Sequence, residues 1–196
     1  MFDRKNFIED SLNESAEVKK LMLEKCYDEI NKAADELVKI IKNGKKIMFI
    51  GNGGSAADSQ HLATEFMIRL SQDLSRPAIA AIALTTDTSN LTAGGNDIGF
   101  ENVFARNVEG LGAEGDALIC FSTSGNSPNI LKAVAKAKEK KIISVGFLGK
   151  DGGRLIKECD YTILIPSDNA QRIQEGHITA GHIICEIVER EVYDDV

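Results

Sequence analysis

The segment from Ile47 to Glu65 combines residue types that could bind an anion and act on it. An apolar run of strand length ends at Gly51, and residues 51–55 read Gly-Asn-Gly-Gly-Ser before a helical pattern begins. Glycines let the backbone approach an anion closely, and the N–H groups at a helix N-terminus attract it. His61 and Glu65 stand four residues apart, so they share one helix face below this loop. The pattern indicates an enzyme that acts on a phosphorylated small molecule.

A second candidate anion loop follows a later apolar run. Residues 122–127 read Ser-Thr-Ser-Gly-Asn-Ser, and Pro128 follows. A serine N-cap and a proline at the first helical position predict a helix start at Ser127. Capping does not explain the other three hydroxyl groups, which could donate to the oxygens of a phosphate monoester. The loop lacks the patterns of a nucleotide P-loop and of a dinucleotide-binding turn.

The composition narrows the class of protein. The 196 residues suit one domain, 43% are hydrophobic, and the net charge is −7 without a basic stripe, which argues against nucleic acid as a direct ligand. The sequence shows neither an apolar run of membrane-spanning length nor a signal-peptide pattern, so we expect a cytoplasmic protein with no membrane partner. The four cysteines are scattered, as in reduced core thiols rather than a disulfide framework or zinc cluster.

Residues 1–43 are predicted to form a helical arm. Glycine and proline are absent from Asp3 to Asn43, and apolar residues recur in steps of three or four, which predicts two helices with a break between Lys20 and Lys25. This much helix before the first strand exceeds what a small sheet needs for cover. The arm could therefore be an oligomerisation surface, or both helices could pack only on their own domain.

Residues 44–196 alternate between strand-like and helix-like segments. The expected strands are Lys46–Ile50, Pro77–Leu84, Asp116–Phe121, Ile142–Phe147 and Tyr161–Ile165. The expected helices are Ser55–Leu70, Ile130–Lys140, Gly153–Lys157 and Ala170–Tyr193. Continuous apolar strands separated by helices predict a doubly wound, three-layer α/β/α sandwich with a five-stranded parallel sheet, in a single domain spanning 1–196. Ligands of such sheets bind at the carboxyl ends of the strands, where loops 51–55, 85–97 and 122–127 fall.

The chain resembles the sugar isomerase (SIS) family, and within it the phosphoheptose isomerases. Both serine-containing loops are similar to the signature loops of the family. Three further motifs resemble those of the phosphoheptose isomerases: Gly95-Asn96-Asp97, Gly149-Lys-Asp-Gly-Gly153 and Arg172-Ile-Gln-Glu175. The resemblance covers essentially the whole chain. It implies the SIS fold, conversion of sedoheptulose 7-phosphate into D-glycero-D-manno-heptose 7-phosphate, a homotetramer and one zinc ion per subunit.

The resemblance also implies roles for individual residues. Glu65 and His182 match the proposed base and acid of the family. The implied metal ligands are His61, Glu65, Gln174 and His182. The implied substrate-binding residues are Asn52, Gly53, Gly54, Ser55, Glu65, Arg69, Asn96, Asp97, Ser122, Thr123, Ser124, Ser127 and Gln174.

The chemistry of ketose–aldose exchange independently fits these roles. A proton moves between two adjacent carbons through an enediol, which requires a base for the carbon-bound proton and an acid or metal for the oxygens. A carboxylate suits the first role, and imidazole with Zn²⁺ suits the second. Glu65 cannot be a firm zinc ligand and a free base at the same moment, so one role must weaken during turnover.

The spacing of two implied ligands predicts an intersubunit active site. Gln174 and His182 stand eight residues apart, about 12 Å along a straight helix. Both can reach one metal only at full side-chain stretch or from different subunits. His177 is closer to Gln174 in spacing, and we expect it to be structural or to support the ligands.

Other features leave alternatives open. Gln171 stands where many phosphoheptose isomerases have an aspartate, which permits an isomerase of another phosphosugar. A non-catalytic SIS protein that binds phosphosugars or associates with a replication initiator is a second alternative, although such proteins typically lack the glutamate and the last histidine, which this chain retains. Residues 149–153 are expected to form a turn, and Asp87 and Asn90 to cap the turn after the second strand.

Overall fold

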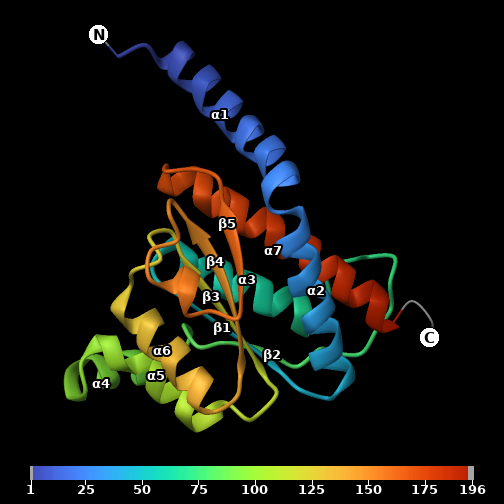
Figure 1. The fold of residues 1–196 in the computed structure, drawn as a ribbon, viewed down its shortest axis with the longest axis vertical. Coiled ribbons are helices and arrows are strands. Elements are labelled where there is room, and N and C mark those ends of the chain that lie inside the picture. The colour runs from blue at the N-terminus through green and yellow to red at the C-terminus, as the bar shows by residue number, and fades with distance from the viewer. Residues whose placement is uncertain (1, 194–196) are drawn as a thin grey trace.

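Two consecutive helices form the N-terminal arm. The structure is a computed structural model that describes residues 2–193. Helices α1 (Arg4–Lys25) and α2 (Tyr27–Lys42) meet at Cys26, one residue beyond the break predicted between Lys20 and Lys25. Asp3 caps α1 by accepting hydrogen bonds from the backbone N–H groups of Lys5 and Asn6, at 3.1 and 3.2 Å. The first half of α1 projects away from the sheet, whereas α2 packs on α7 and β5 (Figure 1).

The five strands form one parallel sheet, as predicted. In chain order they are β1 (Ile47–Gly51), β2 (Ala81–Ala83), β3 (Ala117–Ser122), β4 (Ile143–Gly149) and β5 (Tyr161–Ile165). Their order across the sheet is β2-β1-β3-β4-β5, and all four pairings are parallel. Strand β2 is shorter than the expected Pro77–Leu84 because only three of its residues pair with β1.

Helices cover both faces of the sheet, which confirms the three-layer prediction (Figure 1). The remaining helices are α3 (Gly54–Met67), α4 (Thr88–Asp97), α5 (Phe100–Leu111), α6 (Pro128–Glu139), the 3₁₀ helix η1 (Leu155–Lys157) and α7 (Ala170–Tyr193). One apolar core lies between the sheet and α2, α3 and α7, and a second lies between the sheet, α5 and α6. Within residues 2–193, none of the helices is both long and apolar enough to cross a membrane.

The sequence analysis missed α4 and α5. Every residue of α4 is at least partly exposed, so apolar periodicity does not mark it, and the expected loop 85–97 is helical from Thr88. Asp87 is its N-cap and accepts a hydrogen bond from the N–H of Asn90 at 2.9 Å. By contrast, α5 buries Val103, Phe104, Asn107 and Val108, a helical period that the sequence displays.

Candidate active site

The two anion loops lie side by side at the carboxyl edge of the sheet. Strands β1 and β3 are neighbours, with Gly51 paired to Phe121, so the loops that follow them begin together. A reciprocal amide pair joins the loops: Asn52 Nδ2 donates to Asn129 Oδ1 at 3.0 Å, and Asn129 Nδ2 donates to Asn52 Oδ1 at 2.8 Å. The Asn52 side chain, predicted to contact substrate, is therefore engaged with Asn129. The sequence analysis did not identify Asn129, which is only 3% exposed.

The first loop turns tightly into α3. Gly53 is the N-cap of that helix and has a φ of +56°, a conformation that favours glycine. The N–H of Ser55 donates to the carbonyl of Asn52 at 3.0 Å, and Ser55 is buried. A Cβ on Gly51 would lie 2.3 Å from the Ser55 carbonyl oxygen, so glycine is required there. This geometry places a helix N-terminus at the edge of the sheet, as anion binding requires.

The second loop is organised by its own hydroxyl groups. Ser122 Oγ accepts a hydrogen bond from the N–H of Gly125 at 3.1 Å and lies 3.3 Å from Ser127 Oγ. Ser124 Oγ accepts from the N–H of Asn126 at 3.3 Å, and Thr123 beside it is partly exposed. Ser127 is the N-cap residue of α6, with Pro128 at the first helical position, as predicted.

The Gly149–Gly153 segment forms the expected turn and supports the second loop. Gly125 has a φ of +64°, and a Cβ there would lie 1.9 Å from the carbonyl oxygen of Gly152. The N–H of Leu155 donates to the carbonyl of Gly125 at 3.0 Å, and the N–H of Arg154 donates to Asn126 Oδ1 at 3.1 Å. The turn is thus packed directly against the serine-rich loop.

Three of the predicted metal ligands meet within one chain. His61 and Glu65 project from α3, and His182 projects from α7. His61 Nε2 lies 3.2 Å from Glu65 Oε1 and 2.8 Å from His182 Nε2, and the donor atoms of the three all lie within 4.8 Å of one another. Two imidazole nitrogens and a carboxylate oxygen are a donor set that suits zinc. His182 therefore does not need a neighbouring subunit to reach the other two.

The protonation state of His182 also fits metal binding. Burial lowers the pKa of His182, nearby His61 lowers it further, and Glu65 opposes them by raising it. The net shift favours the neutral imidazole, which is the form that coordinates a metal. The side chain of His61 is 48% exposed and that of Glu65 is 18% exposed, so the cluster opens to solvent.

The fourth predicted metal ligand, Gln174, lies beside the first anion loop. A Cβ on Gly54 would lie 2.8 Å from Gln174 Nε2, which places this amide against the N-terminus of α3. With Asp58, Gln171 and Arg172 it lines a polar cavity. Burial raises the pKa of Asp58 to about 6, with His61 opposing that shift. Asp58 was not among the predicted site residues, although it precedes His61 by one helical turn.

Three other residues predicted to bind substrate, Arg69, Asn96 and Asp97, lie outside the two anion loops. Arg69 is exposed just beyond the C-terminal end of α3, whereas the anion loop lies at its N-terminal end. Asn96 and Asp97 end α4, where Asn96 Nδ2 donates to Asp97 Oδ1 at 2.7 Å. Helix α4 packs on α5, on the opposite side of the sheet from α7 (Figure 1).

His177 is a core residue, in keeping with the structural role expected for it. It is fully buried, its Nε2 lies 3.1 Å from the carbonyl oxygen of Leu148, and its ring lies beside those of Phe121 and Phe147. Burial lowers its pKa to about 4, and the hydrogen bond to Leu148 only partly opposes this. The neutral ring therefore braces the ends of β3 and β4 beneath the serine-rich loop.

Comparisons with known proteins identify the family of the chain. Residues 12–149 match the SIS domain family. A phosphoheptose isomerase of Clostridium acetobutylicum is 48% identical over 193 residues, 97% of each chain. Phosphoheptose isomerase 2 of Campylobacter jejuni is 57% identical over 164 residues, 84% of this chain and 81% of its own. The solved structure of a phosphoheptose isomerase from Neisseria gonorrhoeae has a TM-score of 0.89 at 36% identity and covers 99% of this chain and 100% of its own.

Proposed function

The chain belongs to the phosphoheptose isomerases of the SIS family, and we propose that it converts sedoheptulose 7-phosphate into D-glycero-D-manno-heptose 7-phosphate. The observation that carries this proposal is the cluster of His61, Glu65 and His182, which supplies acid–base groups on the helix that begins at the first anion loop and on α7. A protein that only bound phosphosugars would need the loops but not the cluster.

The two anion loops hold the phosphate group. The donors are the backbone N–H groups of Gly53 and Gly54 and the hydroxyl groups of Ser122, Thr123, Ser124 and Ser127, and the N-termini of α3 and α6 add their positive dipole ends. The polar cavity at Gln174 is open to the sugar hydroxyl groups, and Gln171 lines it too. A glutamine there can hydrogen-bond a hydroxyl group but cannot remove a proton.

Glu65 and His182 move the protons of the reaction. Glu65 accepts the proton from the carbon next to the carbonyl and returns it to the neighbouring carbon, which carries the substrate through an enediol. His182 exchanges the proton of the adjacent oxygen. Zinc held by His61, Glu65 and His182 would polarise the substrate oxygens as a Lewis acid. Because Gln174 lies against Gly54 in the same chain, it would complete the ligand set from a neighbouring subunit.

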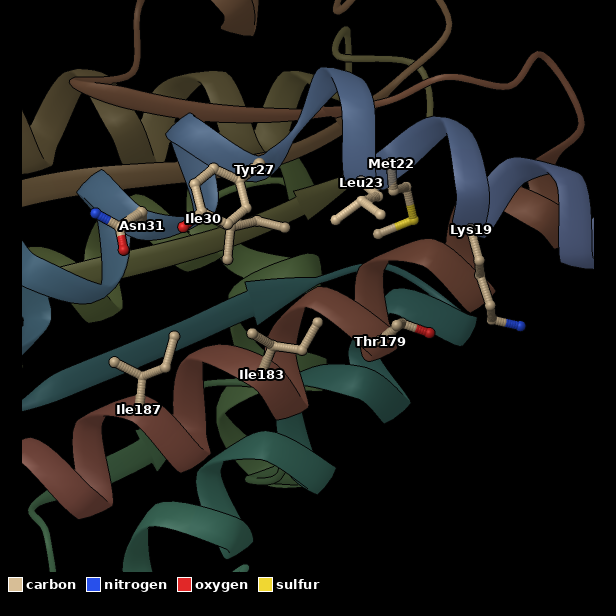
Figure 2. Close-up of a pocket in the computed structure, with 9 residues that line it drawn as sticks. All are labelled: Lys19, Met22, Leu23, Tyr27, Ile30, Asn31, Thr179, Ile183 and Ile187. Carbon is tan, nitrogen blue, oxygen red and sulfur yellow. The ribbon is translucent and has the colours of Figure 1, made fainter.

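The protein assembles as a homotetramer in which neighbouring subunits complete each site. An apolar groove runs between the α1–α2 junction and α7 and is lined by Met22, Leu23, Ile30, Ile183 and Ile187 among others (Figure 2). Leu23 and Ile183 are 71% and 44% exposed, and with the other groove residues they form a contiguous apolar surface of the kind that marks an interaction site. Residues 1–43 are thus the arm of a single SIS domain, and a second copy covers the groove.

Two features of α3 support an intersubunit site. Ser55 and Glu65 are ten residues apart, about 15 Å along the helix. The path from the second carbon of the sugar to phosphorus contains seven bonds of about 1.5 Å each, so a bent chain spans less than that separation. Arg69 lies one further turn away and is exposed, in a position to serve a neighbouring subunit.

One assay tests the function. Purified protein is incubated with sedoheptulose 7-phosphate, with and without Zn²⁺, and aldose formation is followed by NMR, with a hexulose 6-phosphate as the competing substrate. We expect turnover of the heptulose, and the absence of turnover in both conditions would refute the proposal.

Light scattering tests the tetramer, which Ile183→Glu should dissociate. The four free thiols fit a reducing compartment, and we place the enzyme in the cytoplasm.

A further inference from the structure

A buried ion pair links the segment after α3 to α7, and these two helices carry His61, Glu65 and His182. Arg76, in the segment between α3 and β2, pairs with Glu189 on α7, and their side chains are 0% and 1% exposed. Arg76 Nε donates to Glu189 Oε1 at 2.7 Å, and Nη2 donates to the same carboxylate oxygen. A fully buried pair of charges is expensive to desolvate unless every donor and acceptor is satisfied, so its contacts indicate what it holds.

The arginine is also attached to the helix that bears Glu65. Arg76 Nη2 donates to the backbone carbonyl of Glu65 at 2.8 Å. Glu65 lies in the last turn of α3, where carbonyl groups have no partner within the helix, and a cation at this end favours the helix dipole. Arg76 thereby fixes the backbone from which the Glu65 carboxylate reaches His61.

The glutamate secures the segment after α3 and the position of α7. Glu189 Oε1 accepts the N–H of Leu70 at 2.9 Å, and Oε2 accepts the N–H of Ser71 at 3.1 Å, directly after Arg69. Burial by itself would raise the pKa of Glu189, yet the N–H groups and Arg76 hold it below its usual value, so the carboxylate stays charged. His182 lies seven residues earlier on α7, two turns along the helix.

We propose that Arg76 and Glu189 are positioning residues of the active site, which set α3 against α7 so that Glu65 and His61 meet His182. Neither residue touches the donor atoms of the cluster. They act through the Glu65 backbone, the Leu70–Ser71 backbone and the common helix of Glu189 and His182. The inference rests on the proposed function, because it concerns the geometry of the same zinc and proton-transfer site.

The test compares three variants of the full-length protein. Glu189→Gln keeps the shape of the side chain but loses a charged acceptor, and Arg76→Lys keeps the charge but lacks the fork that reaches Glu65 and Glu189 together. Asp116→Asn is the matched control: Asp116 is 2% exposed, pairs with Lys46, and accepts the N–H groups of Lys46 and Ala113 at the amino edge of the sheet, away from the site.

The readouts are zinc affinity, measured against a chromophoric chelator, together with kcat, inorganic phosphate affinity and Tm. Glu189→Gln should lose about 10- to 100-fold in zinc affinity and in kcat, as mutations of residues that orient metal ligands do. Arg76→Lys should lose less in the same direction, and phosphate affinity should not change in either. Asp116→Asn should lower Tm while the folded protein keeps its zinc affinity and kcat.

The outcomes separate the inference from the proposed function. Wild-type zinc affinity and kcat in folded Glu189→Gln and Arg76→Lys would overturn the inference alone, as would equal losses in Asp116→Asn. If Glu189→Gln does not fold, Arg76→Lys decides. A wild-type protein that neither binds zinc nor turns over the heptulose would overturn the proposed function, and the inference with it.

Discussion

Asn52 and Asn129, which are 77 residues apart in the sequence, hold each other by two amide hydrogen bonds of 3.0 and 2.8 Å. Asn129 Oδ1 also accepts the N–H of Ile130 at 3.0 Å, so the same side chain fixes the first turn of α6. The pair links the loop before α3 to the loop before α6. Together with the pairing of β1 and β3, this part-buried contact fixes the relative position of the two candidate phosphate-binding loops.

Breaking this pair should weaken substrate binding more than chemistry. Asn129→Ala leaves the Asn52 amide without its partner in a part-buried site, which should reduce stability by about 1–3 kcal/mol. We expect KM to rise about tenfold, equivalent to about 1.4 kcal/mol, with a smaller change in kcat. Steady-state kinetics measure both. Asn102→Ala, which removes an amide from α5, should leave KM unchanged, and an equal rise there would contradict the role of the pair.

The serine-rich loop should tolerate no side chain at Gly125. Gly125→Ala combines a φ of +64° with a contact of 1.9 Å to the Gly152 carbonyl, so the loop or the turn must move. Gly44→Ala shares the φ penalty, at +69°, but its Cβ would meet open space. Gly44→Ala should lose about 1–2 kcal/mol of stability with normal kinetics. Gly125→Ala should lose more and also bind phosphate poorly, as calorimetry with inorganic phosphate would report. Equal effects would rule out the clash as the cause.

How far the sequence predicts this fold depends on the kind of signal that each element carries. Strand β5 and helix α7 match their predicted bounds because apolar spacing marks both. Helix α4 lacks such spacing because it buries little, and the sequence around its N-cap Asp87 indicates only a capped turn. Asn129, Arg76 and Glu189 act through partners 77 or 113 residues away. No local pattern distinguishes them from ordinary surface polar residues, so only the fold identifies them.

Metal removal should separate the chemical step from phosphate binding. In the proposed site, His61, Glu65 and His182 supply the ligand atoms, whereas the serine hydroxyl groups and loop N–H groups are the proposed donors to the anion. Dialysis against a chelator should abolish or strongly reduce kcat, and stoichiometric Zn²⁺ should restore it. Affinity for inorganic phosphate should remain the same throughout. Full activity of protein shown by elemental analysis to be metal-free would contradict a catalytic role for zinc.

Stability should fall on acidification because of His177. Its pKa is about 4 in the folded protein and 6.5 in the unfolded chain, since burial disfavours the charged ring. Between these values only the unfolded state binds the proton, so the free energy of unfolding should fall by about 3 kcal/mol as the pH drops from 6.5 to 4. Above pH 6.5 the group contributes no pH dependence. Urea unfolding of wild type and His177→Gln at several pH values tests this, because parallel curves would exclude His177 as the cause.

Glu65 is proposed both to bind zinc and to act as the base. Glu65→Gln keeps the size and hydrogen-bonding reach of the side chain but removes its basicity, so kcat should fall by about 10²- to 10⁴-fold. Zinc affinity should also fall, because an amide is a weaker ligand than a carboxylate, and kcat should stay low even when saturating Zn²⁺ is added. Phosphate affinity should persist, since the anion loop lies about 15 Å away along α3.

Glu186→Gln on the exposed face of α7 is the control and should behave as wild type. Recovery of kcat in Glu65→Gln at saturating Zn²⁺ would show that Glu65 serves only to bind metal, and the base would then have to be sought elsewhere in the site. Parallel loss of turnover and phosphate affinity would instead make Glu65 an architectural residue of α3.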